Sequence, residues 1–229
     1  VTLRKASIDQ SVVEGNVPFT PILSYFMEKN AEPQHYNQAV LFTADDDVNV
    51  SDLIPILNKL QEHHDALRIV LEHGKQGWVL TNKGLNFPVS VQEFNIRDKG
   101  DPHREMEVLI NNLQKHVNLN DGPLFRIAII RTPDGSRLFM VCHHLVIDTV
   151  SWRILLEDFH TLSTQQKESL PFALPPKTHS FKYWAESLAQ YADTDAFLVQ
   201  RSYWETLENM PRTPLPKDFD VVSNLRADT

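Results

Sequence analysis

The chain has 229 residues, of which 41% are hydrophobic and 23% are charged, so it has the composition of a globular protein with a sizeable core. Its formal net charge of −8 argues against a nucleic-acid partner, because neutralising phosphates requires a basic face. A single cysteine, no apolar run near the roughly 20 residues of a bilayer span, and no apolar signal core at the start predict a cytoplasmic protein, or a piece of one, without disulfides or a membrane partner.

The first half of the chain is predicted to mix helices with strands. Thr20 is a candidate N-cap and Pro21 suits a first helical position, so a short helix is expected there. Ser51 and Asp52 can cap a helix that runs through residues 53–64. The other elements expected in this half are strands at 35–44, 66–74, 77–82 and near 87–94, and an amphipathic helix over 103–117.

The second half opens with a clear hairpin signal. Residues 123–132 and 136–144 are nearly continuous in apolar side chains and flank a Pro-Asp-Gly turn. Such runs are typical of central strands that are covered on both faces. Further helices are expected over 149–162 and near 180–191 and 194–209, before a proline-containing extended tail. These elements predict an α+β fold, with helices packed around a mainly antiparallel or mixed sheet.

Two adjacent histidines, His143 and His144, end the second strand of this hairpin. Neighbouring side chains on a strand point to opposite faces, so one histidine can face a cavity while backbone groups hold the other under the loop. This divergence, and the lack of H-x-x-x-H, C-x-x-C or H-x-E spacing, predicts no metal site. Histidine suits proton transfer near neutral pH, and the alternative is a pair of structural, hydrogen-bonded histidines.

The residues around the pair have structural interpretations. Asp148 precedes a helical pattern, so it is expected to cap that helix or to pair with an arginine, for which Arg68 is the candidate. Ser151 lacks the G-x-S-x-G setting of a nucleophile. Trp152 is expected on the core face of the helix, and Cys142 is expected to pack inertly within the buried strand.

Four stretches resemble the epimerization branch of the condensation superfamily in nonribosomal peptide synthetases. "HHLVIDTVSWRILLEDF", from His143 onward, resembles the signature H-H-x-x-x-D-x-x-S-W of that superfamily. The other three, in matching order and spacing, are "GNVPFTPILSYFMEKNAEPQHYNQAVLF", "HHDALR" and "KTHSFKYWAESLAQYA". The resemblance runs from about residue 12 to about residue 210.

The resemblance implies a chloramphenicol-acetyltransferase-like fold of two lobes with a channel between them, of which this chain matches the N-terminal lobe. Residues 18–210 would form the lobe, 1–17 a lead-in linker, and 211–229 an extended link toward a C-terminal lobe. The implied activity is removal and return of the α-proton of an aminoacyl or peptidyl thioester, which interconverts its L and D configurations. A carrier protein presents this thioester on its phosphopantetheine arm, so the implied partners are that protein and the C-terminal lobe. No directly bound cofactor is implied, and the isolated lobe is expected to be inactive.

Roles carry over to matching positions of this sequence. By resemblance, His144 corresponds to the catalytic second histidine of the signature and His143 to the supporting one. Asp148 matches the structural aspartate, whose usual partner corresponds to Arg68. The remaining supporting positions of the signature are Ser151 and Trp152. The second acid or base is expected on the C-terminal lobe, where a glutamate is the candidate.

Three positions depart from the family pattern. Thr149 replaces the usual glycine after the aspartate, and Leu23 and Tyr25 stand where glutamine and tryptophan are common. Two alternatives therefore stay open: a condensation domain, in which His144 positions or deprotonates an attacking amine, and a catalytically degenerate module that docks a carrier protein. The stretches "SWRILLED" and "KTHSFKYWAESL" favour epimerization over condensation.

Overall fold

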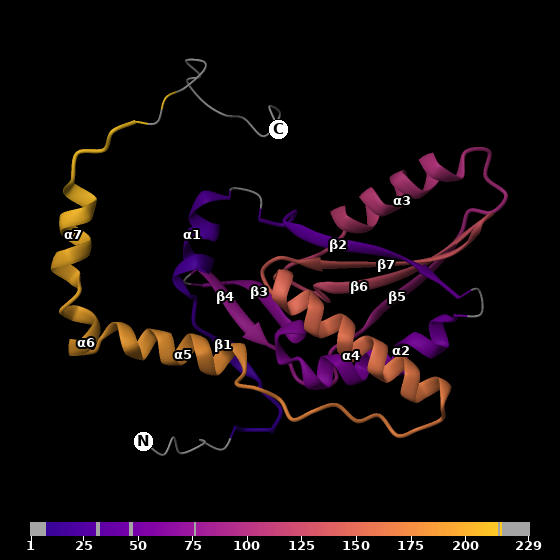
Figure 1. Cartoon of the computed structure of the whole chain (residues 1–229), viewed down its shortest axis with the longest axis horizontal. Coiled ribbons are helices and arrows are strands. Elements are labelled where there is room, and N and C mark those ends of the chain that lie inside the picture. Colours follow the sequence, from indigo (N-terminus) through magenta and orange to yellow (C-terminus); the bar gives the residue numbers. More distant parts are fainter. Residues whose placement is uncertain (1–7, 31–32, 46–47, 76, 215, 217–229) are drawn as a thin grey trace. The chain divides into compact units, whose positions relative to one another are not determined.

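The computed structural model describes residues 8–30, 33–45, 48–75, 77–214 and 216 (Figure 1). The chain divides into two compact units, Val1–Ala189 and Gln190–Thr229, and each is described by itself. The fold is α+β, as predicted. The first seven residues of the predicted lead-in and most of the predicted extended link lie outside the described residues.

A four-stranded mixed sheet forms the centre of the first unit. Its strand order is β2 (Asn37–Ala44), β7 (Gly135–His143), β6 (Phe125–Thr132) and β5 (Ser90–Asn95). The predicted hairpin is confirmed, because β6 and β7 pair antiparallel through the turn at Gly135. β5 runs parallel to β6, which makes the sheet mixed.

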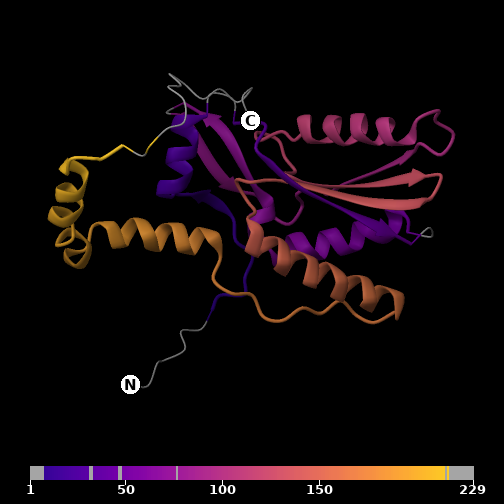
Figure 2. The same cartoon turned by 45° about the horizontal axis from the view of Figure 1, so that its top comes forward.

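Helices cover both faces of this sheet, which explains the nearly unbroken apolar runs of β6 and β7. Figure 2 shows α3 (Pro102–Lys115) on one side and both α2 (Val50–His63) and α4 (Thr149–Lys167) on the other. Alternate residues of the two strands divide accordingly. The core on the α2 and α4 side includes Ile127, Ile129, Leu138, Met140 and Cys142, whereas that on the α3 side includes Ala128, Ile130, Phe139 and Val141.

A second, three-stranded sheet has the order β1 (Gly15–Val17), β4 (Gly77–Asn82) and β3 (Ile69–Gly74). Residues 15–17, which the sequence placed in the lead-in, thus pair with β4. The predicted strand over 66–74 begins only at residue 69, because the preceding Asp65–Arg68 forms a 3₁₀ helix, η1. The short helix α1 (Pro21–Lys29) begins as predicted, with Pro21 in its first turn.

Two helices differ from their predicted bounds. α2 begins at Val50, before the expected caps, and Asp52 instead accepts a hydrogen bond from the backbone N–H of Asn49 (3.2 Å). The helix expected over 194–209 is divided into α6 (Asp195–Leu198) and α7 (Arg201–Asn209), which follow α5 (Phe181–Ala192). In the part of the chain that is described, no helix combines the length and apolarity needed to cross a membrane.

Candidate active site

The end of β7 brings the two histidines to different environments. His143 is fully buried: its Nε2 donates to the carbonyl of Pro33 (2.8 Å), and its Nδ1 accepts the backbone N–H of Leu145 (3.1 Å). Because a backbone N–H is always a donor, the Nδ1 of His143 is unprotonated and its proton lies on Nε2. Burial lowers the pKa of His143 to about 4, so this ring is neutral and ties the strand end to the loop before β2.

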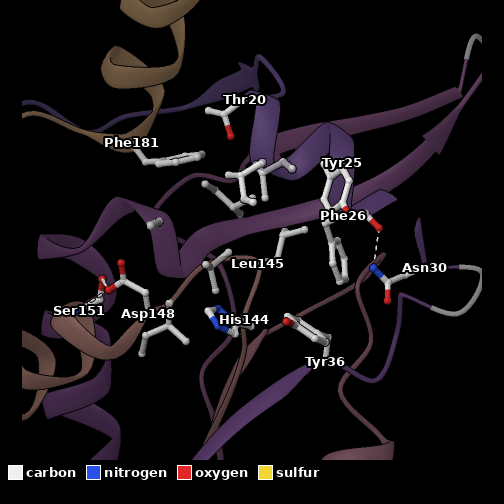
Figure 3. Close-up of a pocket in the computed structure, with 16 residues that line it drawn as sticks. Thr20, Tyr25, Phe26, Asn30, Tyr36, His144, Leu145, Asp148, Ser151 and Phe181 are labelled. Atoms are coloured by element: carbon white, nitrogen blue, oxygen red, sulfur yellow. Dashed lines mark hydrogen bonds between the residues drawn. The ribbon is translucent and has the colours of Figure 1, made fainter. Parts of the chain in front are cut away.

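His144 is only partly buried and lines a cavity of about 600 Å³ (Figure 3). Its backbone N–H donates to the carbonyl of Tyr36 (2.8 Å), which anchors it to the residue before β2. The phenol ring of Tyr36 stacks on the imidazole at 5.2 Å between centroids and 16° between planes. The imidazole Nε2 lies 3.0 Å from the amide nitrogen of Gln38. The ring is therefore fixed from the β2 side and open to the cavity.

The rest of the cavity wall is mainly apolar. It is formed by α1, the segment between β7 and α4, the first turn of α4, and residues Ala66, Ile69 and Phe181. Both residues that depart from the family pattern in α1, Leu23 and Tyr25, belong to this wall. A largely apolar pocket that also presents an imidazole suits proton transfer to or from a weakly acidic carbon.

Asp148 caps α4 at the cavity rim. Its Oδ1 accepts both the hydroxyl and the backbone N–H of Ser151, each at 2.7 Å. These two hydrogen bonds lower the pKa of Asp148, so the carboxylate is charged at neutral pH. The structure thus places His144, Asp148 and Ser151 around one cavity, with Thr149 as the first residue of α4.

The expected pairing of Asp148 with Arg68 is wrong. Arg68 is fully buried and binds Asp65 through Nη2 (2.8 Å), three positions earlier in the 3₁₀ helix. Its other acceptors are the backbone carbonyls of Gln61, Lys83 (2.9 Å) and Val13 (3.1 Å). Within the described ranges no hydrogen bond or ion pair joins Arg68 to Asp148. Asp65 is the partner because residues i and i+3 of a 3₁₀ helix lie above one another, which places its carboxylate beside the guanidinium of Arg68.

Two residues of the site were not anticipated. Tyr36 and Gln38 both contact the His144 ring, and the Oε1 of Gln38 also accepts the indole N–H of Trp152 (3.0 Å). The signal was present, because two polar residues spaced i, i+2 face the same side of a strand. Trp152 itself is buried on α4, as expected, with the indole nitrogen as its polar contact.

A model of the condensation domain matches residues 13–229 of this chain. The chain belongs to the condensation-domain family. Two relatives are gramicidin S synthase 1 of Brevibacillus brevis and tyrocidine synthase 1 of Brevibacillus parabrevis, each 36% identical over 96% of this chain. The chain spans only 20% of the length of each of these two proteins.

Solved structures of condensation-family domains share the lobe fold. The epimerization domain from the third module of tyrocidine synthetase B is 35% identical, with a TM-score of 0.86 over 93% of this chain and 50% of that one. The starter condensation domain of rhizomide synthetase is 17% identical, with a TM-score of 0.72 over 87% of this chain and 49% of that one. The second likeness shows the fold alone.

The structure also contains a second histidine pair, at the C-terminal end of α2. His63, His64 and Asp158 of α4 have ligand atoms within 4.8 Å of one another, so they are the described group that could hold a metal ion. The Nε2 of His64 is already hydrogen-bonded to Asp158 (2.8 Å), which joins the residue after α2 to α4. This contact favours a structural tie between α2 and α4 over a cation site.

Proposed function

We propose that this chain is the N-terminal lobe of an epimerization domain, with residues 18–210 as the lobe. Its substrate would be an aminoacyl or peptidyl thioester on the phosphopantetheine arm of a carrier protein. The observation that carries the proposal is the 35% identity to an epimerization domain of the same fold, against 17% to a starter condensation domain.

In the proposed reaction His144 is the acid/base. The thioester makes the α-carbon acidic, so the Cα–H bond breaks, its electron pair moves into the carbonyl as an enolate, and the imidazole takes the proton. His143, neutral and held by backbone groups, fixes the strand end without taking part in the transfer.

Inversion requires a proton to return to the opposite face of the α-carbon. By resemblance, a glutamate of the C-terminal lobe would supply this proton. The chain spans 50% of the solved epimerization domain, so that glutamate would lie in the half that the chain does not match. The cavity beside His144 would then be one half of a site that the second lobe closes. We therefore expect residues 1–229 alone to be inactive.

The second candidate is peptide-bond formation by a condensation domain. The same cavity and His144 would then position or deprotonate an attacking amine, and the starter condensation domain shares the fold. A docking module without catalysis is the third, and the replacement of the usual glycine by Thr149 keeps it open. Epimerization predicts exchange of the α-hydrogen, condensation predicts formation of an amide, and docking predicts neither reaction.

The test uses the full-length protein that carries this chain and a carrier protein loaded with an L-aminoacyl group, in deuterated buffer. Mass spectrometry follows α-deuterium incorporation, and chiral analysis follows the ratio of L to D. We expect exchange and inversion in the wild type, loss of both in His144→Ala, and no change in His103→Ala, an exposed histidine on α3. Amide formation without α-exchange would support condensation, and carrier binding without either reaction would support docking.

A further inference from the structure

The side-chain amide of Gln38 bridges two rings that are far apart in the sequence. Its Oε1 accepts the indole N–H of Trp152 at 3.0 Å, and its Nε2 lies 3.0 Å from the Nε2 of His144. Gln38 is partly buried on β2, an edge strand of the mixed sheet, and Trp152 is buried in the first turns of α4. The three side chains thus connect the sheet edge, the helix and the cavity histidine.

The chemistry of these groups allows one arrangement of protons. An indole nitrogen is only a donor, so the carbonyl end of the Gln38 amide must face Trp152. The amide nitrogen, which is also only a donor, is left facing His144. The Nε2 of a neutral His144 must therefore accept, and its ring proton lies on Nδ1. An amide flip would place two donors together at Trp152.

We infer that Gln38, oriented by Trp152, is a positioning residue that holds His144 as the Nδ1–H tautomer and leaves Nε2 as the basic nitrogen. Its catalytic meaning rests on the proposed epimerization, but the tautomer itself does not. His143 carries its proton on Nε2, so the two adjacent histidines are held in opposite tautomers. Different backbone and side-chain partners impose this difference on two identical side chains.

Protonation changes the balance at this bridge. Once Nε2 of His144 takes a proton, two N–H groups face one another, so the Gln38 amide must move away or lose its bond to Trp152. Among the described residues, the titratable groups beside the ring are Tyr36, stacked on it, the adjacent neutral His143, and Tyr25 and Asp148, which line the same cavity. The Gln38 amide therefore has to be displaced before Nε2 can hold a proton, and release of that proton allows the bridge to form again.

The direct test is ¹⁵N nuclear magnetic resonance of histidine-labelled full-length protein at about pH 8, where an ordinary imidazole is neutral. Comparison with His144→Gln assigns the ring. We expect a protonated Nδ1 and an unprotonated Nε2 in the wild type, and a mixture of tautomers in Gln38→Met, which has a similar shape and no donor. A protonated Nε2 in the wild type, or an unchanged tautomer in Gln38→Met, would overturn the inference.

Gln38→Glu tests the same bridge by replacing the amide donor that faces His144 with a negatively charged acceptor. A carboxylate can accept from both Trp152 and a protonated Nε2, so it favours the imidazolium, which has no basic nitrogen. In the α-exchange assay we expect kcat/KM to fall about a hundredfold near neutral pH and its acid limb to move to higher pH, against a loss of about tenfold or less in Gln38→Met. The matched control is Gln92→Glu, which adds the same charge at an exposed position of β5, at the other edge of the sheet.

The readouts separate the two proposals. An acid limb that moves equally in Gln38→Glu and Gln92→Glu would refute a specific effect of Gln38 on the His144 ring. If the wild type shows the expected tautomer, and Gln38→Met loses it, while no α-exchange occurs, the positioning role stands and the epimerase assignment fails. If α-exchange occurs but the tautomer is the other one, the epimerase assignment stands and the positioning role fails.

Discussion

The neutralising partner of Arg68 gives the sharpest test of the packing around the site. The structure pairs this fully buried guanidinium with Asp65, whereas the sequence motif suggested Asp148. Replacing either aspartate by asparagine removes one charge at nearly constant volume. The two interpretations predict opposite rankings of the variants.

The magnitudes follow from burial. Asp65 is 7% exposed, so Asp65→Asn leaves a buried guanidinium without its counter-ion, which typically costs about 3–5 kcal/mol of unfolding free energy. Asp148 is exposed and acts as the N-cap of α4, and asparagine caps a helix about as well as aspartate. We therefore expect Asp148→Asn to cost less than about 0.5 kcal/mol.

Urea unfolding followed by tryptophan fluorescence measures both values, and unchanged m-values would show that the comparison concerns stability. Arg201→Ala is the control for loss of an arginine, because its pair with Glu205 is exposed and is expected to contribute well under about 1 kcal/mol. Adding Arg68→Met to Asp65→Asn is expected to cost less than the sum of the single changes. An Asp148→Asn variant as unstable as Asp65→Asn would refute the pairing that the structure shows.

Four further predictions concern single side chains. Leu60→Ala, at a fully buried position, is expected to lower the unfolding free energy by about 2–5 kcal/mol in the same assay. Asp148→Ala is expected to cost about 1 kcal/mol, with Asp148→Asn restoring the cap; equal losses in both would contradict capping. Burial raises the pKa of Cys142, so a thiol reagent at pH 8 is expected to label it only on unfolding, and rapid labelling of the folded chain would contradict this. Since folding lowers the pKa of His143 from its usual 6.5 to about 4, the unfolded state binds more protons between these values. Protonation of His143 therefore does not lower the free energy of unfolding above about pH 6.5, but lowers it by up to about 3 kcal/mol as the pH falls toward 4. His143→Asn is expected to flatten this dependence on pH.

The parts of the fold that depend on local pattern were predictable from the sequence. The β6–β7 hairpin and its central place in the sheet follow from two long apolar runs around a Pro-Asp-Gly turn. α3 follows from its apolar spacing, and the start of α1 from Pro21. In each case the decisive information lies within about twenty neighbouring residues.

Contacts between distant segments were not predictable in the same way. Gln38 and Trp152 are 114 positions apart, and nothing local states that one amide serves both this indole and His144. The partner of Arg68 was misassigned for the opposite reason: a local carboxylate, Asp65, was available three positions away. Pairing a buried charge with a partner that is close in sequence loses less conformational entropy than pairing it with a distant one, and here the partner lies three positions away.

The two adjacent histidines have different environments because neighbouring side chains of a strand point to opposite faces. His143 is the last residue of β7 and His144 follows it, yet His143 points into the backbone of the loop before β2 and His144 toward the cavity. The buried ring has no free nitrogen, because both are bonded to backbone groups. The partly buried ring of His144 is instead bonded at Nε2 to the side-chain amide of Gln38. A side chain can move away from the ring more easily than the backbone carbonyl of Pro33 that holds His143. This difference, more than exposure alone, is why we propose His144 rather than His143 as the residue that exchanges a proton.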